Sequence, residues 1–522
     1  MHHPPAVGRS SPPPAVARSR PALRPGLRTA VLSALRSALR SALRPALGAP
    51  QRSAPRAALP AILVAAGVWA ALPVALHAQP AGQSQQSQPF FGFAQGPSQQ
   101  IANPGLGPLF GAPYPDEHLF GDWGGLRTWL DKHGINVALD WLTENAGNVT
   151  GGQRGRFDFS GQVAMEVDLD LKRLLGIDNT AVHVMIVNGN GRNLSADALG
   201  DDLADVQEIY GSRGNVVARM VYAYAERSFL HDRVDIAAGW LPVGNYFASS
   251  PLYCRFMSVL ICGNPHPLPN YPGEPDWPDA SLGGQVRVLA TSSIYVMAGL
   301  FSVDPSFNSG GGGISGWAWA DPHKSGVSTP VEVGWVPVFG RDKLPGHYKL
   351  GFDHDSHEYA DVALAGRSHN RDMEYALFDQ MLERQGPGPN DGLIVFGGYV
   401  HADADVSPLS QHAFLGLTST AAMFGRPKDT IGASVQWIEM SSAYTHAQEA
   451  AAFGANPFPL TLDGFGPAYG PQNTEQVAEL NYNISVFRGV SIMPDFQYII
   501  RPGATTNTPD AAVLGFRTNI LF

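Results

Sequence analysis

Side chains that carry charge or form hydrogen bonds recur at alternate positions along many short stretches of this 522-residue chain. In the stretch QVAMEVDLDL, Glu166 and Asp168 alternate with Met165 and Val167, and in EQVAELNYNISV the acidic Glu479 stands between apolar neighbours. A period of two places such groups on one face of an extended strand. Carboxylates accept hydrogen bonds and guanidinium groups donate them, so these faces are suited to binding polar solutes.

Motifs for covalent, nucleotide or metal chemistry are weak. The stretch NGNGRN at 188–193 lacks the spacing and the helical context of a dinucleotide loop, and SGGGG at 309–313 lacks the Lys-Ser/Thr of a phosphate loop. The stretch DHDSH at 353–357 could hold a metal ion, but a solvated turn is the favoured interpretation. We find no strand that places a Ser–His or Asp–His pair on a common face. We therefore predict no catalytic residue, no metal and no cofactor.

The chain contains two cysteines, Cys254 and Cys262. In an exported protein, such a pair predicts a disulfide rather than a metal site, because no His or further Cys lies nearby at ligand spacing. Closing so short a loop contributes about 2–3 kcal/mol, so the bond would pin a local structure rather than staple the whole fold.

The beginning of the chain differs from the rest in composition. Residues 1–78 contain ten Arg and no Asp, Glu or Lys, and include an apolar run at about 57–76 that ends in a small-x-small sequence. This pattern predicts a secretory signal peptide behind a basic extension, with a membrane anchor as the alternative. Its removal leaves 25 basic against 45 acidic side chains, which argues against nucleic-acid binding. Residues 79–117, rich in Gln, Pro and Gly, are expected to be disordered.

The remaining chain predicts one helix followed by strands. Residues 118–134 carry a helical pattern, and from 135 to 522 the apolar period is two. About sixteen segments follow this period, each close to ten residues long. They lie near 135–143, 162–171, 180–187, 216–228, 233–241, 281–290, 293–303, 330–338, 346–354, 372–383, 392–400, 410–418, 430–438, 475–486, 489–500 and 512–522.

An all-β fold of this kind is either a soluble sandwich or a membrane barrel. No stretch of eighteen apolar residues follows residue 80, so transmembrane helices are excluded there. Strands of about ten residues can cross a bilayer at a tilt, and an even strand number suits a barrel. The apolar faces also carry aromatic residues near their ends, including Trp141, Trp335 and Tyr498. We predict a transmembrane antiparallel β-barrel at 135–522 whose last segment, ending at Phe522, pairs with its first.

The stretch LFGDWGGLRTWLDKHGI resembles the entry motif of the carbohydrate-selective porins of Gram-negative outer membranes (OprB-type). Further landmarks follow in that family's order: AAGWLPVGNYFASSPLYCRFMSVLICGNP, LPGHYKLGFDHDS, GLIVFGGYVHADAD, FGRPKDTIGASVQW and EQVAELNYNISVFRGVSIMPDFQYIIRPG. The resemblance covers about 118–522. It implies a sixteen-stranded barrel with a narrow channel that admits sugars such as glucose by passive diffusion. Trp240 departs from the family pattern, which usually has Arg there.

For such a channel, the expected lining is the polar face of the strands, because an uncharged sugar exchanges its water for charged, amide and aromatic groups. Arg287 and Arg517 are the strongest candidates, since a guanidinium can bridge two hydroxyl oxygens. The alternative for each residue is a wall position that only solvates the channel or pairs across strands. The other candidates are Glu166, Asp168, Gln285, Glu332, Lys349, Asp353, Glu479, Asp495 and Gln497.

The expected partners are small carbohydrates, outer-membrane lipid and the barrel-assembly machinery, while the oligomeric state stays open. The acidic segment 194–211 between two strands could fold inward and narrow the pore. Two competing functions are an outer-membrane barrel enzyme and a structural or export role in exopolysaccharide secretion, for which the Gln-rich lead could serve as a tether.

Overall fold

The computed structural model describes residues 118–210, 215–267, 278–304, 316–317, 325–362, 366–386, 391–420, 424–452, 460–461 and 467–522. The predicted extension, signal peptide and disordered lead at 1–117 lie outside this range. Within the described residues, no helix is long and apolar enough to cross a membrane.

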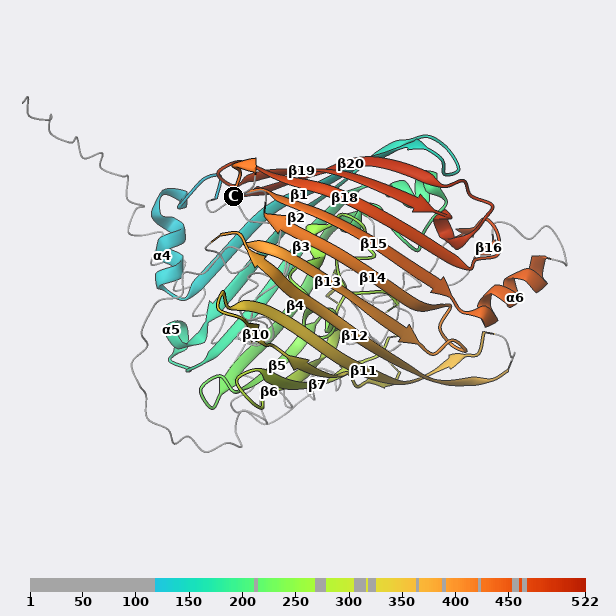
Figure 1. Ribbon diagram of the computed structural model, residues 1–522. Helices are drawn as coiled ribbons and strands as arrows, with labels where there is room; N and C mark the ends of the chain where they lie inside the picture. Colours follow the sequence, from blue (N-terminus) through green and yellow to red (C-terminus); the bar gives the residue numbers. More distant parts are fainter. Residues whose placement is uncertain are drawn as a thin grey trace, which may run out of the picture.

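Sixteen antiparallel strands form a closed wall in the described part of the chain (Figure 1). They are β1 (Ile135–Thr150), β2 (Phe157–Asp170), β3 (Thr180–Gly191), β4 (Val216–Phe229), β5 (Val234–Leu241), β6 (Ser281–Leu289), β7 (Ile294–Ser302), β9 (Val331–Trp335), β11 (Leu344–Ala360), β12 (Ser368–Arg384), β13 (Gly392–Ala402), β14 (Leu409–Thr420), β15 (Thr430–Met440), β18 (Thr474–Phe487), β19 (Val490–Ile500) and β20 (Ala511–Leu521).

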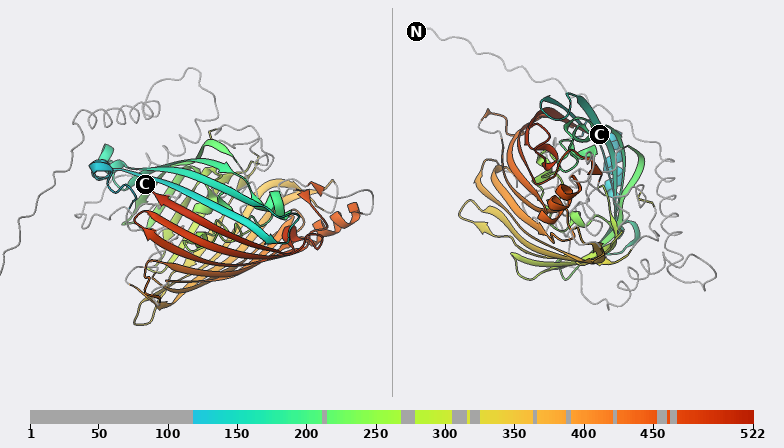
Figure 2. Two further views of the ribbon diagram at one scale, coloured as in Figure 1. Left: turned by 90° about the horizontal axis from the view of Figure 1, so that it is seen from above. Right: turned by 90° about the vertical axis from the view of Figure 1, so that its right-hand side faces the viewer.

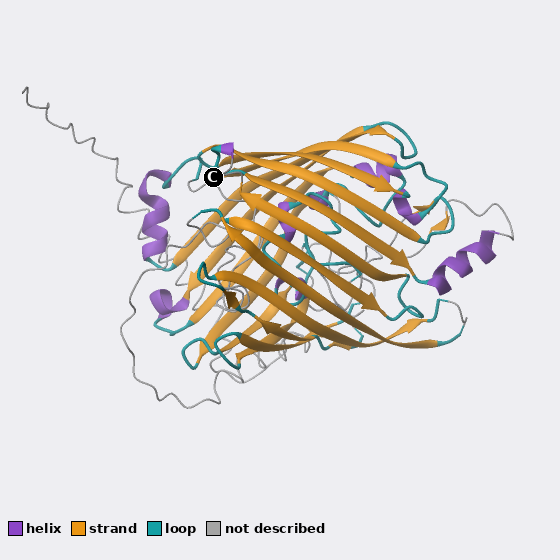
Figure 3. Ribbon diagram, viewed as in Figure 1, coloured by secondary structure: helices purple, strands orange, loops and turns teal. Residues whose placement is uncertain are grey.

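Minor elements complete the fold. The short strands β8 (Val327–Ser328) and β10 (Val338–Phe339) join the wall, and β16 (Leu460–Thr461) pairs with β17 (Pro467–Ala468). Helices α4 (Leu126–Lys132) and α5 (Leu171–Leu175) lie at one end of the barrel, and α6 (Ser442–Ala452) lies at the other (Figure 3).

The wall closes because the first strand pairs on both sides. Leu139 of β1 lies opposite Met165 of β2, and Trp141 of β1 lies opposite Ile520 of β20. Each remaining strand of the wall pairs with its neighbours in chain order, and β7 joins β11 through β9. A closed wall leaves no unpaired edge, which is what a sheet needs in lipid. The predicted barrel of about sixteen strands is confirmed.

The pattern of exposure along the strands is that of a barrel with a polar interior. On β18, Glu479 is 3% exposed and Asn481 is 4% exposed, whereas Leu480 between them is 54% exposed. The outward residues of β20, such as Leu514 and Phe516, are likewise exposed. A soluble sandwich would bury the apolar face instead. The apolar face therefore points outward and the charges point inward, as in transmembrane barrels.

The connections differ in length at the two ends of the barrel. One end carries short turns such as that between β18 and β19, where Gly489 adopts φ +73°, a conformation that favours glycine. The other end carries the long connections, including those from β3 to β4 and from β5 to β6. Figure 2 (left) shows the strands running obliquely between the two ends. Long loops at one end and short turns at the other are typical of outer-membrane barrels.

The segment before β1 packs against the end of β20 at the short-turn end. The backbone N–H of Leu119 donates to the carbonyl of Leu521 at 2.7 Å. The Phe120 and Phe522 rings stack with centroids 5.6 Å apart, and the Arg127 guanidinium donates to the Phe522 carbonyl at 2.8 Å. The first described residues therefore hold the strand that closes the barrel.

Candidate functional site

Two long connections fold into the lumen of the barrel. They are the segment 192–210 after β3 and the segment 242–267 after β5, called here the first and second inward segments. Most described residues of both are buried, including every residue from 240 to 258. Figure 2 (right), which looks along the barrel, shows green chain inside the ring of strands. These segments occupy part of the lumen, so the interior is not an open pore.

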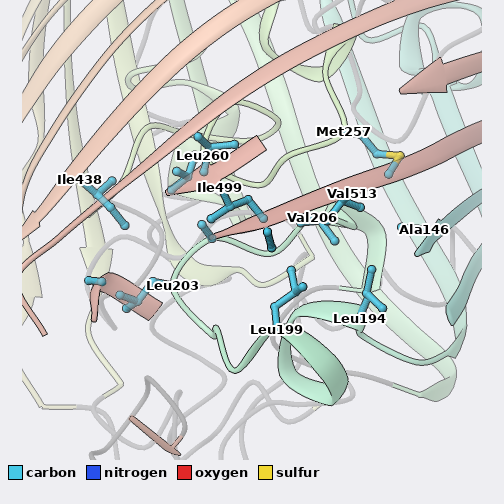
Figure 4. Packing of buried hydrophobic residues seen from close by; sticks show 14 of the residues in the cluster. Ala146, Leu194, Leu199, Leu203, Val206, Met257, Leu260, Ile438, Ile499 and Val513 are labelled. Carbon is cyan, nitrogen blue, oxygen red and sulfur yellow. The ribbon is translucent and has the colours of Figure 1, made fainter. Parts of the chain in front are cut away.

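The first inward segment packs through apolar side chains against the inner wall. Leu194, Leu199, Leu203 and Val206 are each at most 1% exposed. They belong to one cluster with wall residues of β15, β19 and β20 (Figure 4). The inner face of β15, β19 and β20 is apolar where this segment lies, and its side chains bury the leucines of the segment. The prediction that the segment could fold inward agrees with this arrangement.

The two inward segments also contact each other. The N–H of Val259 donates to the Asp205 carbonyl at 2.9 Å, and the N–H of Glu208 donates to the Met257 carbonyl at 3.2 Å. Burial raises the pKa of Asp202 to about 6 and that of Asp205 to about 8, although the Asn193 amide donates to Asp205 at 2.8 Å. At neutral pH the Asp205 carboxyl group therefore favours its protonated form, whereas the Asp202 carboxyl group is mostly ionised.

Arg517 anchors the second inward segment. Its guanidinium donates from Nε to Glu144 Oε1 at 2.8 Å and to the carbonyls of Cys254 and Phe256, each at 2.9 Å. Cys254 forms a disulfide with Cys262. The side chains of Arg517 and Glu144 are only 6% and 0% exposed. A residue predicted to bind solute therefore holds the tip of the segment that narrows the lumen.

Three further predicted lining residues hold the same segment. Glu479 accepts from the N–H of Met257 at 2.6 Å. Lys349 donates from Nζ to the Ser249 carbonyl at 2.5 Å. Glu332 accepts from the N–H of Ala248 at 2.9 Å, and it also accepts from two tyrosine hydroxyls.

The side of the second inward segment that faces β12–β14 packs through aromatic residues: Tyr253, Phe256, Phe396 and Phe414. Polar anchors and apolar contacts together fix its position.

A separate group of polar side chains lines the wall formed by β1–β6. Gln285 Nε2 donates to Asp235 at 3.2 Å, and Asp235 is the cross-strand partner of Arg287. The Arg287 side chain is 1% exposed, and its two terminal nitrogens have no hydrogen-bond partner among the described residues. Glu166 accepts from the Tyr222 hydroxyl at 2.6 Å. We call Asp140, Glu166, Asp168, Glu226, Asp235, Gln285 and Arg287 the polar chamber.

The remaining predicted residues have local partners. His183 contacts Asp168 at 2.7 Å, and Asp353 accepts from the Ser328 hydroxyl at 2.9 Å. Gln497 donates to Asp495 at 2.9 Å and to the Val206 carbonyl of the first inward segment at 3.1 Å. All eleven predicted lining residues lie on the inner face. The structure places Gln285 and Arg287 beside Asp235, and it places Glu166 and Asp168 on β2 beside Tyr222 and His183. Asp353 lies apart, and the others lie chiefly around the inward segments.

Sequence reasoning missed several functional positions. Glu144 lies one residue beyond the predicted segment 135–143, because β1 extends to Thr150. Tyr222 and Glu226 lie in the stretch VYAYAER, whose two-residue period was a usable signal. The inward path of 242–267 has no period, so no pattern indicated it. Asp235 and Ala237 lie on the inner face of β5, and the period of two places Trp240 on the opposite face. Trp240 packs there with Met220 and Ala280, outside the polar chamber.

The stretch 353–357 does not form a metal site. Its side chains contact separate partners, with His354 at 2.7 Å from Asp372 and Asp355 bonded to Arg371 at 3.1 Å. Across the described residues, no group of three or more His, Cys, Asp or Glu is placed to hold a metal ion. The arrangement as a whole suits noncovalent passage of a polar solute.

Comparisons with known proteins agree with this geometry. The sequence model of the carbohydrate-selective porin, OprB family, matches residues 156–522. Porin B of Pseudomonas aeruginosa is 27% identical over 428 residues, covering 77% of this chain and 91% of the relative. The putative porin QuiX of Acinetobacter baylyi is 26% identical over 416 residues, covering 77% and 93%. A high-pH structure of Pseudomonas putida OprB superposes with a TM-score of 0.70 at 28% identity, covering 78% of this chain and 99% of that one.

Proposed function

Because the chain belongs to the carbohydrate-selective porin family (OprB), whose members are sugar channels of Gram-negative outer membranes, we propose that it carries monosaccharides such as glucose into the periplasm by passive diffusion. In outer-membrane barrels the short turns face the periplasm and the long loops face outward. Solute would then enter among the long loops and pass the two inward segments. It would leave past the polar chamber at the periplasmic half.

Arg287 is the residue that best supports a sugar-binding step. Its buried guanidinium offers terminal N–H groups that no described residue uses, and Gln285 and Asp235 lie beside it. A guanidinium can donate two parallel hydrogen bonds to neighbouring sugar hydroxyls, while the carboxylate accepts from others. Release requires weak binding, so each contact should be transient.

The other predicted lining residues are assigned a positioning role. Arg517, Glu332, Lys349 and Glu479 hold the second inward segment through the contacts given above, and Gln497 contacts the first. They would set the width of the passage. Glu166 and Asp168 would line the route on β2, on the same inner face as Arg287, and Asp353 and Asp495 remain candidates for the outer part of the route.

Permeation through proteoliposomes tests this proposal. Purified protein should admit glucose faster than a charged solute of similar size, and glucose should reduce ion conductance as it occupies the passage. Arg287→Ala should weaken that block about tenfold, since a hydrogen bond to a charged group contributes about 1.5–3 kcal/mol. The matched control is Arg227→Ala. It removes an arginine from β4 whose side chain lies on the opposite face of the strand, away from the lumen.

Equal entry of glucose and the charged solute would refute the sugar channel. An unchanged glucose block in Arg287→Ala, with the barrel folded, would remove Arg287 from the route. Release of a modified sugar during transport would show enzymatic activity, against our inference that the channel carries out no chemistry.

We infer the remaining biology from the sequence. Residues 1–78 would direct export and be cleaved, and residues 79–117 would form a disordered lead. The outward apolar face would contact lipid, and β20 would be read by the assembly machinery. Mass spectrometry of the mature protein from outer membranes would test the cleavage after residue 78.

A further inference from the structure

We propose that Glu144 couples the two inward segments, so that they seat in the lumen and leave it as one unit. The inference goes beyond the sugar-channel proposal, because it concerns how the passage is held and is measured without a sugar. It depends on a closed series of hydrogen bonds that runs from the wall to one segment, across to the other segment, and back to the wall.

Glu144 of β1 reaches both segments through its two carboxylate oxygens. Its Oε1 accepts from the Arg517 guanidinium at 2.8 Å, and Arg517 donates to the Cys254 and Phe256 carbonyls of the second inward segment. Its Oε2 accepts from the backbone N–H of Ile209, in the first inward segment, at 3.1 Å. The Glu144 side chain is fully buried. One carboxylate therefore bonds to the first segment directly and to the second segment through Arg517.

The two segments complete the series by bonding to each other beside these contacts. The N–H of Glu208 donates to the Met257 carbonyl at 3.2 Å. Glu208 precedes Ile209 and Met257 follows Phe256, so each adjoins a residue that is held by way of Glu144. Met257 also belongs to the apolar cluster that buries the leucines of the first segment (Figure 4).

Release of one segment alone would leave buried polar groups without partners. If the first segment left, Glu144 Oε2 and the Met257 carbonyl would each lose a donor. If the second segment left, the Arg517 guanidinium would lose two acceptors. Each buried group left unpaired disfavours such a state by about tenfold in population. States with both segments seated or both released are therefore favoured over states with one segment seated.

Two anchors outside this series hold one segment each and allow the coupling to be tested. Leu199 of the first segment is fully buried in the apolar cluster. Lys349 of β11 donates from Nζ to the Ser249 carbonyl of the second segment. Independent segments would respond only to the loss of their own anchor, whereas coupled segments would respond to the loss of either anchor.

The sequence provides a different protease site in each segment. The second inward segment contains Arg255 as its one basic cleavage site for trypsin, and it contains no Asp or Glu. The first inward segment contains several Asp and Glu but no Lys or Arg after Arg192. Trypsin and an endoprotease specific for acidic residues therefore report on the two segments separately. Cleavage follows the population of the released state when reseating is faster than cutting. Mass spectrometry after reduction of the disulfide locates each cut.

We expect Leu199→Ala to raise cleavage at the acidic sites of the first segment by about tenfold or more, because the variant leaves a cavity in a packed cluster. If the segments are coupled, trypsin cleavage at Arg255 rises by a similar factor in the same variant. Lys349→Met should likewise raise cleavage of both segments. This transfer of an effect from one segment to the other is called the cross-effect.

Glu144→Gln should weaken the cross-effect severalfold, because an amide keeps one acceptor oxygen and cannot accept from both Arg517 and Ile209. The matched control is Asp429→Asn. Asp429 is a buried carboxylate at the turn before β15, where it accepts from Arg426 Nη2 at 3.1 Å and from the Tyr482 hydroxyl at 2.9 Å. The cross-effect should persist in this background.

The outcomes decide the proposal. If Leu199→Ala and Lys349→Met each raise cleavage of their own segment alone, or raise no cleavage, the segments are not coupled. An undiminished cross-effect in Glu144→Gln would assign the coupling to other contacts and remove Glu144 from it. Should Glu144→Gln fail to fold, single-channel recordings of Leu199→Ala in potassium chloride supply a second test, since coupled segments give two conductance levels and independent segments give intermediate ones. Because these measurements use no sugar, failure of glucose entry would refute the sugar channel and leave the coupling standing.

Discussion

Arg517 of β20 and Glu144 of β1 lie directly opposite each other on the two strands that close the barrel, and their side chains form a buried ion pair. The same guanidinium binds the carbonyls of Cys254 and Phe256. One side chain therefore joins barrel closure to the position of the second inward segment, and its loss should affect both.

We expect Arg517→Ala to destabilise the folded barrel by about 3–5 kcal/mol, because Glu144 would keep a buried charge without its partner. The tip of the second inward segment would also lose two donors, so single-channel conductance should rise and become noisier. Heat-dependent gel mobility and bilayer recordings measure the two effects. Arg233→Ala, at an exposed turn, is the control. A variant with wild-type stability and conductance would disprove the anchoring role.

Glu332 should behave as the centre of a hydrogen-bond network. Its carboxylate accepts from Tyr295 at 2.6 Å, from Tyr375 at 2.7 Å and from the N–H of Ala248. Tyr375→Phe should lower the free energy of unfolding by about 1.5–3 kcal/mol, and Glu332→Ala should cost more. The double variant should cost less than the sum, because both changes remove one shared contact. Additive effects in urea unfolding would contradict the network.

The seating of the first inward segment should depend on pH. The pKa of Asp205 lies above its ordinary value of 3.8, at about 8, so the seated form binds the proton more tightly than the released form. Stability of the seated segment is therefore greatest at acid pH, falls as pH rises from about 4 to about 8, and then levels off. Protease sensitivity and current noise should be higher at about pH 9 than at about pH 6. Asp205→Asn should flatten the dependence, and an unchanged profile in that variant would assign it to other groups.

The outward face can be tested at a single position of β18. Leu480 is 54% exposed, between the buried Glu479 and Asn481. Leu480→Arg should destabilise the barrel in phospholipid bilayers by about 2–4 kcal/mol if the residue lies near the mid-plane. Leu480→Met serves as the conservative control. Equal stability of the Arg and Met variants would mean that this face does not contact hydrocarbon.

The strands were predictable because their signal is local. The sixteen expected segments correspond to the sixteen strands of the wall, and the alternation around Leu480 already separated inner from outer positions. The main error at strand ends was length: β1 runs seven residues past its expected end, which hid Glu144.

The roles of inner residues were not predictable in the same way. Arg517 and Arg287 look alike in sequence, since each is a guanidinium on the polar face of a strand. What distinguishes them is the path of residues 242–267, whose carbonyls meet Arg517 from more than 250 positions away. That path depends on tertiary packing of aromatic side chains, such as Phe256 against Phe396, and no local period encodes it.

The contact of Arg127 with Phe522 joins residues 395 positions apart. Because the chain is synthesised from its N-terminus, the segment around Leu119 and Arg127 is made before β20, to whose end it forms hydrogen bonds. A truncated product would lack β20, so Leu119 and Arg127 would lose their hydrogen bonds to its end. The β1–β20 seam can therefore form only after β20 has been exported, so the wall closes only once its last described strand is present.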